Sequence, residues 1–272
     1  HQTYPHKMLT GRKQAYMDPA LYDSVSPYTD PAETPHDLFK IGHTSTSISL
    51  ALGLAKARDI MDGKENIIAV IGDGSMSGGE ALEGLNVAGE LNSNFIIVFN
   101  DNQMSIAENH GGMYDQFAEL RRTNGAAENN LFKSMGMDYL YVNDGNDIEA
   151  LIAAFEQVKD STHPVVVHIN TLKGKGYAPA EANKEKWHWH MPFDIQTGQS
   201  PASGSSESYA SIFAEYALKR AKTDPKFLVL MSAVPGLLGL TQERREELGK
   251  HYLDVGIAEE TAVAMASGAA HA

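Results

Sequence analysis

The sequence predicts an α/β protein built on a doubly wound parallel sheet. Residues 67–71 and 95–99 are short runs that are apolar throughout, as expected of parallel strands buried on both faces. Between them, apolar side chains recur at helical spacing, with glutamates on the opposite side. Such a strand–helix–strand unit is a right-handed crossover, which brings the carboxyl ends of its strands to one edge of the sheet, where α/β proteins bind ligands.

The other elements follow from the same patterns. Residues 16–37 are rich in Pro, Asp, Ser and Tyr and read as irregular structure, whereas a polar turn at 41–47 opens a helix that runs to about Asp62. Asp147 has the character of a helix N-cap. We expect further strands at 139–142, 164–169, 227–233 and 252–255, helices at 148–158, 209–217, 241–250 and 261–272, and a loop with a short helix at 107–130.

The clearest domain boundary is a polar segment rich in Gly, Ser and Pro at residues 195–207. It divides a first domain, residues 1–194, from the start of a second α/β domain, residues 208–272, which contains too few elements to be complete. The chain also begins with His and stops inside a predicted helix. We therefore expect a piece of a longer protein.

Composition limits the classes of function. With 272 residues and 42% hydrophobic content the chain can build a substantial core. A formal charge of −13 argues against nucleic acid or an anionic membrane as a partner. No apolar run is long enough to span a bilayer, and we recognise no hydrophobic region typical of a secretory signal. The absence of cysteine does not identify the redox compartment directly, but a soluble protein without disulfides fits the cytoplasm, which is the location we expect.

The tips of the two strands of the crossover carry the chemistry. Asp73 lies between Gly72 and Gly74, which permit a tight turn and expose N–H groups suited to phosphate. A carboxylate would repel a phosphate bound there, unless a divalent cation lies between them. Asp73 and the amide oxygen of Asn102, after the second strand, are suitable ligands for such a cation. The pair of loops therefore predicts a metal-bound diphosphate.

Two other interpretations of the glycine turn remain open. Gly72, Gly74 and Gly78 with Asp101 are similar to a dinucleotide fingerprint, but Ser77 occupies the position of the third glycine. A purely structural turn is the second alternative.

Four segments, in this order, resemble the 1-deoxy-D-xylulose-5-phosphate synthase family of transketolase-like thiamine diphosphate enzymes. They are HQTYPHKMLTGR (1–12), GHTSTSIS (42–49), VIGDGSMSGGEALEGLN (70–86) and FNDNQMSI (99–106). TLKGKGY (171–177), a His followed six residues later by Asp in 188–194, and DVGIAE (254–259) extend the resemblance. It implies the parallel-sheet thiamine diphosphate-binding fold.

The resemblance also implies roles for individual residues. Asp73, Asn102 and the carbonyl of Met104 would hold Mg²⁺, and Glu259, His1 and His188 would be catalytic. Glu259 would contact the pyrimidine nitrogen of the cofactor, with Glu260 facing solvent. The cofactor-binding set would be His1, Gly42, His43, Thr44, Gly74, Ser75, Asn102, Lys173, Tyr177 and Glu259.

The implied activity is that of a transferase. Pyruvate and glyceraldehyde 3-phosphate would condense, with loss of CO₂ and through a thiamine diphosphate carbanion, to 1-deoxy-D-xylulose 5-phosphate for isoprenoid and thiamine biosynthesis. A homodimer is expected. Transketolase-type ketol transfer and an inactive thiamine diphosphate-binding homologue are the alternatives.

Two positions bear on the strength of the resemblance. Asn146 stands where family members commonly have His, which weakens any contact assigned there. His190 lacks the spacing to Asp194 that His188 has, so His188 is the preferred acid/base candidate. The arginines expected to bind the acceptor phosphate are absent from these residues.

Overall fold

The computed structural model describes residues 3–200 and 207–271. The chain divides into two compact units, His1–Thr44 and Ser45–Ala272. The first unit contains helix α1 (Thr3–Lys7), the helical turns η1 (Met8–Arg12), η2 (Lys13–Tyr16) and η3 (Pro19–Leu21), and the irregular segment that the composition of residues 16–37 predicts.

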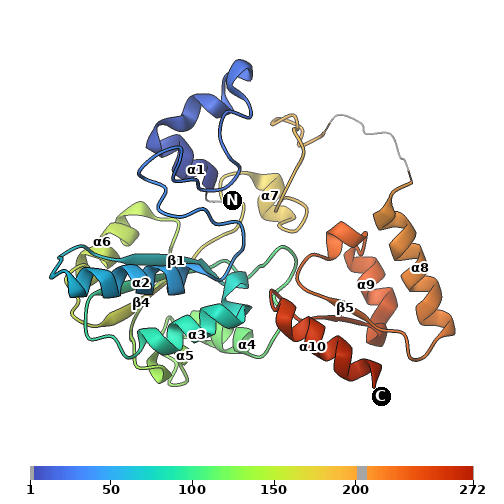
Figure 1. The fold of residues 1–272 in the computed structure, drawn as a ribbon. Helices are drawn as coiled ribbons and strands as arrows, with labels where there is room; N and C mark the ends of the chain where they lie inside the picture. The colour runs from blue at the N-terminus through green and yellow to red at the C-terminus, as the bar shows by residue number, and fades with distance from the viewer. Residues whose placement is uncertain (1–2, 201–206, 272) are drawn as a thin grey trace. The chain divides into compact units, whose positions relative to one another are not determined.

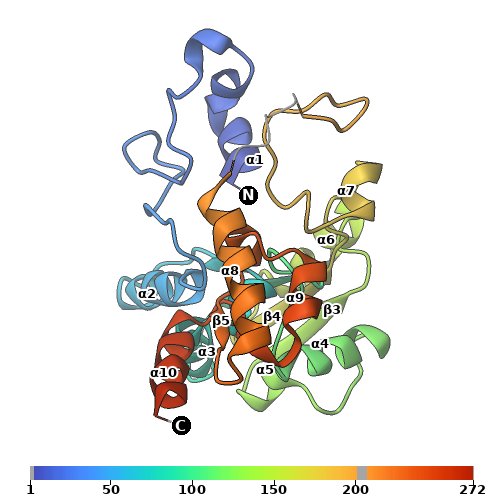
Figure 2. The ribbon, with the colours of Figure 1, turned by 90° about the vertical axis from the view of Figure 1, so that its right-hand side faces the viewer.

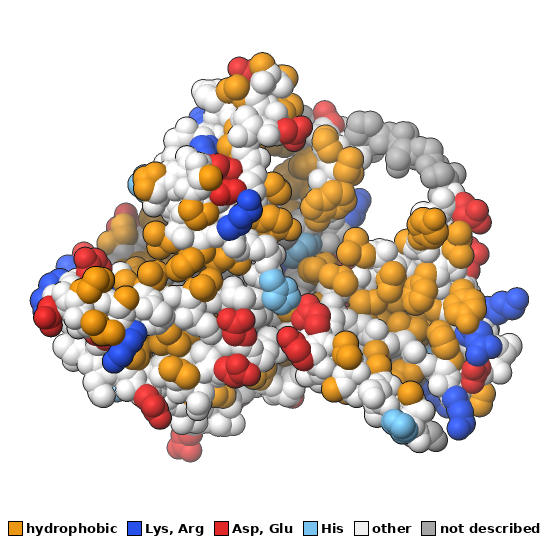
Figure 3. Space-filling model, viewed as in Figure 1, with side chains coloured by type: hydrophobic (Ala, Val, Ile, Leu, Met, Phe, Trp, Pro, Cys, Tyr) orange, Lys and Arg blue, Asp and Glu red, His pale blue; other side chains and the backbone are white. Residues whose placement is uncertain are grey.

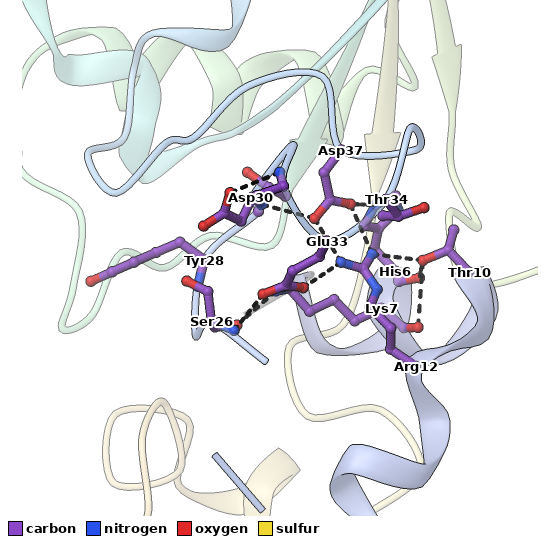
Figure 4. A network of polar contacts seen from close by, with 12 residues as sticks. His6, Lys7, Thr10, Arg12, Ser26, Tyr28, Asp30, Glu33, Thr34 and Asp37 are labelled. Atoms are coloured by element: carbon purple, nitrogen blue, oxygen red, sulfur yellow. Dashed lines mark hydrogen bonds and ion pairs between the residues drawn. The ribbon is translucent and has the colours of Figure 1, made fainter. Parts of the chain in front are cut away.

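A cluster of ionic contacts holds the first unit together (Figure 4). Asp37 accepts hydrogen bonds from both terminal nitrogens of Arg12, at 2.7 and 2.8 Å, and lies 2.7 Å from the His6 ring. Glu33 lies 2.7 Å from both Arg12 and Lys7, and the Lys7 side chain is completely buried. The guanidinium of Arg12 keeps the pKa of Asp37 well below its usual range. Because this unit has little regular secondary structure, these paired charges do much to fix its fold.

The second unit is organised around a four-stranded sheet that is parallel, as predicted, with its strands in the order β1-β2-β4-β3 (Figure 1). Its strands are β1 (Ile68–Gly72), β2 (Phe95–Asp101), β3 (Asp138–Val142) and β4 (Pro164–Asn170). The helices of this part are α2 (Ser47–Ile60), α3 (Gly79–Ala88), α4 (Met113–Arg122), α5 (Leu131–Ser134), α6 (Ile148–Val158) and α7 (Ala178–Ala182), with the 3-10 turn η4 (Gly74–Ser77).

Helices cover both faces of this sheet, which confirms a doubly wound fold. Alternate residues of β2 face opposite sides: Phe95 and Phe99 join a core with α2, α3, α4 and α5, whereas Ile96 and Val98 pack with α6. Figure 1 shows α6 on one side of the sheet and α3, α4 and α5 on the other. The Asp147 side chain accepts a hydrogen bond from the Glu149 N–H at 3.0 Å and caps α6, as the sequence predicts.

The prediction that both crossover strands are buried on two faces is correct for β2 and wrong for β1. Ile68 and Val70 of β1 are 49% and 57% exposed. β1 is an edge strand, and in the described chain the core that contains α6 includes residues of β2, β3 and β4 but none of β1. Burial on one face alone therefore suffices to hold β1 beside β2.

Residues 207–271 form a separate parallel pair of strands, β5 (Val229–Met231) and β6 (Tyr252–Asp254). The other elements are α8 (Tyr209–Thr223), η5 (Pro235–Leu238), α9 (Gln242–Leu248), η6 (Gly249–His251) and α10 (Glu259–Ala270). α8 and α9 lie alongside each other (Figure 2) and enclose their own small core with β5, in which Ala214, Val229 and Leu248 are buried.

Much of the surface over this last segment is apolar (Figure 3). Tyr209 and Tyr216 of α8 are 94% and 52% exposed, and α10 has no buried residue in the described chain. Among the helices of residues 3–200 and 207–271, none combines the length and hydropathy needed to cross a bilayer.

Candidate functional site

The loop after β1 approaches the loop after β2 very closely. A Cβ added to Gly74 would lie 2.9 Å from Cα and Cβ of Ser105, a distance that real side chains do not tolerate. Neither Gly72 nor Gly74 has a positive φ. The expectation that both glycines are needed for an unusual backbone turn is therefore wrong. Gly74 is required because another backbone passes next to it, and nothing lies within 4 Å of a Cβ added to Gly72.

Asp73 is the charged group at this crossing, and it is only 1% exposed. Its carboxylate accepts a hydrogen bond from Asn109 Nδ2 at 2.7 Å, and its backbone carbonyl accepts one from the Tyr114 hydroxyl at 3.1 Å. Burial and the neighbouring charge of Asp101 raise the pKa of Asp73 to about 6, although hydrogen bonds from Asn109 and from the N–H groups of Gly74 and Asn102 oppose the rise. A cation at this carboxylate would remove that penalty.

The loop after β2 takes a strained turn. Gln103 has φ of +66°, a region that side chains other than glycine rarely enter. Two side chains at the carboxyl end of β2 stabilise this turn. Asp101 Oδ1 accepts the Gln103 N–H at 3.1 Å, and Asn102 Oδ1 accepts the Met104 N–H at 3.2 Å. The turn leaves Asn102 and Met104 half-buried, and the Asn102 N–H hydrogen-bonds the predicted metal ligand Asp73.

A buried polar network supports this turn from behind. Asp101 is fully buried and pairs with Arg121 and with His168 Nε2, at 3.0 Å in the latter case. The Tyr139 hydroxyl lies 2.7 Å from His168 Nδ1. Burial alone would raise the pKa of Asp101, but the His168 hydrogen bond and the charge of Arg121 hold it below its usual value. Burial lowers the pKa of His168, so the imidazole is neutral at pH 7 and joins a phenol to a carboxylate.

Sequence reasoning named Asp101 but missed its partners, because they come from α4, β3 and β4. A histidine inside the apolar strand PVVVHI was the available signal. A histidine at 0% exposure in a strand core needs two polar partners, and here it has them.

Lys173 and His188 lie together at the same edge of the sheet. Lys173 Nζ donates to the carbonyl of Ser105 at 2.6 Å and to His188 Nδ1 at 2.9 Å. Burial lowers the pKa of Lys173 to about 8, and burial together with the Lys173 charge lowers the pKa of His188 to about 4. At pH 7 the pair is therefore an ammonium group and a neutral imidazole. Asn146 also serves this loop, because its Oδ1 accepts the Leu172 N–H at 2.7 Å.

Tyr177 and His190 belong to an aromatic cluster. The Tyr177 ring meets Trp187 edge-on, with centroids 5.1 Å apart, and His190 stacks on the same Trp187 at 4.3 Å. Among the described residues, His188 is therefore the one of the two histidines that contacts Lys173, and His190 has a packing role.

Glu259 begins α10 and is exposed, as is Glu260. Hydrogen bonds from the backbone to Asp254 fix the loop before Glu259. Asp254 Oδ1 accepts the N–H groups of Ala233 and Gly256, both at 2.9 Å. The Ser77 hydroxyl at the end of η4 accepts the Ile257 N–H at 3.0 Å. The strand tip that carries Asp73 and the loop that carries Glu259 are thus in direct contact.

A second contact between residues 207–271 and the preceding part of the second unit involves Arg245 of α9, which is only 6% exposed. Its terminal nitrogens pair with both carboxylate oxygens of Glu185 at 3.1 Å and with Glu108 at 2.9 Å. Glu185 also accepts the backbone N–H of His188 through its carbonyl, at 3.1 Å.

The remaining predicted residues are found in two parts of the chain. Gly42, His43 and Thr44 are exposed and belong to the first unit, where the Tyr28 ring is 3.7 Å from a Cβ added to Gly42. Ser75 is half-buried, and its carbonyl accepts the Ser45 hydroxyl at 2.7 Å. His1 lies outside the described residues.

The donor set at Asp73 fits a hard cation bound jointly with a ligand. In the described part of the chain, Asp73 has no salt bridge to a basic side chain, and the buried atoms Asn109 Oδ1 and Ser105 Oγ have no hydrogen-bond partner. No group of three or more His, Cys, Asp or Glu suited to a metal occurs among these residues. A metal here would therefore depend on one carboxylate, amide or carbonyl oxygens and oxygens of a ligand, which suits Mg²⁺.

Comparison with known proteins identifies the family. A sequence model described as 1-deoxy-D-xylulose-5-phosphate synthase matches residues 1–130 and 121–171. The 1-deoxy-D-xylulose-5-phosphate synthase 1 of Geobacter sulfurreducens is 38% identical over 99% of this chain and 48% of its own length. The corresponding synthases of Pelotomaculum thermopropionicum and Halothermothrix orenii are 37% and 36% identical, over 99% and 100% of this chain.

The chain spans about half the length of these curated relatives. The match nevertheless extends along nearly all of its residues, and the parallel sheet with flanking helices is the fold that the resemblance implied. The chain belongs to the 1-deoxy-D-xylulose-5-phosphate synthase family.

Proposed function

We propose that the protein containing this chain condenses pyruvate with glyceraldehyde 3-phosphate, releases CO₂ and forms 1-deoxy-D-xylulose 5-phosphate, with thiamine diphosphate and Mg²⁺ as cofactors. The structural observation that carries the proposal is Asp73, a buried carboxylate at the tip of a parallel strand. Among the described residues it forms no salt bridge, and the charge of Lys173 acts on it only from a longer distance. In a chain of this family, that environment supports a cation that joins the protein to a diphosphate.

The residues on this edge have distinct tasks in the proposal. Asp73, Asn102 and the Met104 carbonyl would hold Mg²⁺, and the Gly74 and Ser75 backbone with Lys173 would bind the diphosphate. Lys173 supplies the local positive charge that a protein of net charge −13 needs beside an anionic ligand. When bound, thiamine diphosphate supplies a nucleophilic carbon and an electron sink for decarboxylation.

Proton handling falls to Glu259 and His188. The exposed carboxyl of Glu259 is available to a pyrimidine nitrogen, where it would hold the proton that sets the tautomer. His188 is neutral at pH 7 and accepts a hydrogen bond from Lys173, so it would take a proton only from a substrate group close to its other ring nitrogen. His1, Gly42, His43, Thr44 and Tyr177 complete the proposed cofactor site.

We propose the same organisation that the composition of the chain predicts: a diphosphate-binding domain at 1–194, a linker at 195–207, and the start of a pyrimidine-binding domain at 208–272. The separate sheet and core of residues 207–271 support it. We further propose a cytoplasmic homodimer whose product serves isoprenoid and thiamine biosynthesis.

The test is CO₂ release by the full-length protein. With Mg²⁺ and thiamine diphosphate, labelled pyruvate should yield CO₂ at a rate that glyceraldehyde 3-phosphate increases. Glu259→Gln should abolish this turnover, whereas Glu260→Gln, an equally exposed neighbour on the same helix, should retain it.

Other outcomes would favour other functions. Turnover of ketose phosphates without CO₂ would indicate ketol transfer. Cofactor binding without turnover in the wild-type protein would indicate an inactive binding homologue.

A further inference from the structure

The Ser77 side chain joins two loops that are 180 residues apart in the sequence. Its hydroxyl oxygen accepts the Ile257 N–H at 3.0 Å and lies 2.9 Å from the carbonyl of Gly74, to which it donates. The Ile257 carbonyl is a more distant acceptor, at 3.3 Å. One hydroxyl thus connects the turn that follows Asp73 to the loop that precedes Glu259.

The backbone of the 255–258 loop passes close to the Ser77 hydroxyl. Gly256 has φ of +76°, and a Cβ added there would lie 3.1 Å from the Ser77 oxygen. The N–H of Gly256 is held by Asp254, and the Ala258 N–H returns to the Gly256 carbonyl at 2.9 Å. The loop is therefore fixed at its start by Asp254 and in its middle by Ser77, which contacts Ile257, two residues before Glu259.

The contact needs a hydroxyl. The single proton of Ser77 is used within η4, toward Gly74, which leaves the oxygen lone pairs for Ile257. Alanine would leave the Ile257 N–H without this acceptor, and water would have to replace it at the junction. The loss of one such hydrogen bond corresponds to roughly a tenfold change in the population of the positioned loop.

We propose that Ser77 is a positioning residue that couples the diphosphate-binding turn to the placement of Glu259. The proposal rests on the function proposed above, because it assigns Ser77 to the same cofactor site. Ser77 touches neither substrate nor cofactor in this role; it acts through the 255–258 loop.

The experiment compares Ser77→Ala with wild type in the full-length protein, by three measurements. Amide hydrogen exchange of residues 255–260 without cofactor should be about tenfold faster in the variant. Deuterium exchange at the thiazolium carbon of bound thiamine diphosphate, which reports Glu259, should be about tenfold slower at saturating cofactor and Mg²⁺. The dissociation constant of thiamine diphosphate should change less than threefold.

Matched variants separate positioning from general damage. Ser77→Thr keeps the hydroxyl and should restore both exchange rates to within about threefold of wild type. Gly256→Ala adds a methyl group 3.1 Å from the same oxygen and strains the backbone at a φ of +76°, so it displaces the same loop and should shift both exchange rates in the same direction as Ser77→Ala. Ser134→Ala removes a serine hydroxyl that donates to the Asn130 carbonyl in the same helix turn, and should leave all three measurements unchanged.

The outcomes are distinguishable from failure of the proposed function. Absence of thiazolium exchange in wild type would refute that function. Exchange in wild type that is equal in Ser77→Ala would overturn the positioning role alone. A loss of thiamine diphosphate affinity as large as the loss of thiazolium exchange would also overturn the positioning role, because Ser77 would then help to bind the diphosphate.

Discussion

Asp73→Asn should stabilise the metal-free protein, although it removes a residue proposed to be essential. The pKa of Asp73 is about 6 in the folded chain against an ordinary value of 3.8, so ionisation is disfavoured by folding. The penalty is small below pH 4, grows between about pH 4 and pH 6, and is essentially complete at pH 7.5. A shift of about two pKa units corresponds to roughly 3 kcal/mol.

The neutral amide escapes this penalty and can still accept the hydrogen bond that Asn109 donates. At pH 7.5 in EDTA, the variant should therefore melt about 6 to 12 °C above wild type, if each kcal/mol shifts the melting temperature by about 2 to 4 °C. At pH 3 the two proteins should melt together, because the carboxyl is then protonated in both the folded and the unfolded state. Differential scanning calorimetry at both pH values measures this.

Addition of Mg²⁺ and thiamine diphosphate should reverse the order, because only the wild type gains from a cation at this position. Asp160→Asn provides the control, since Asp160 is exposed and its substitution should change stability by less than about 0.5 kcal/mol. The reasoning fails if Asp73→Asn melts at or below the wild-type temperature at pH 7.5 in EDTA.

Two further predictions concern packing and charge. Gly84→Ala should lower the free energy of unfolding by about 1 to 3 kcal/mol, because the added Cβ would lie 2.9 Å from Ile48. Gly53 is also in a helix but has open space around it, so Gly53→Ala should raise the free energy of unfolding by about 0.5 to 1 kcal/mol. Urea denaturation measures both, and equal effects would contradict the packing argument. Because the pKa of Lys173 is about 8, its charge is lost above that pH, and thiamine diphosphate should bind about tenfold more weakly at pH 9 than at pH 7. Calorimetric titration tests this, and an identical pH dependence in Lys173→Met would exclude Lys173 as the cause.

The sequence predicts local features well, because the information for them is local. The helix at 148–158 and its cap Asp147 occur as expected, since a capping side chain and an apolar period lie within a few residues of each other. β2 is buried on both faces because it is a central strand. The exposure of Ile68 and Val70 in β1 depends on strand order, which no local pattern specifies.

The same distinction applies to the candidate site. The approach of the Asp73 and Asn102 loops could be predicted, because consecutive strands of a crossover end at one edge of the sheet. The metal and cofactor roles of these residues stay predictions. The contacts of Asp101 with His168 and of Ser77 with Ile257 were not predicted, since their partners come from distant elements.

Arg245 limits how the two parts of the second unit can separate. Its side chain is 5% exposed, so moving α9 away from Glu108 and Glu185 would leave a desolvated cation without its counter-ions. A partial displacement of α9 is therefore costly, because it removes the counter-ions before water can reach the guanidinium. A complete displacement lets water hydrate the guanidinium. Opening should consequently release the Glu108 and Glu185 contacts in one step, because both carboxylates share the same buried guanidinium.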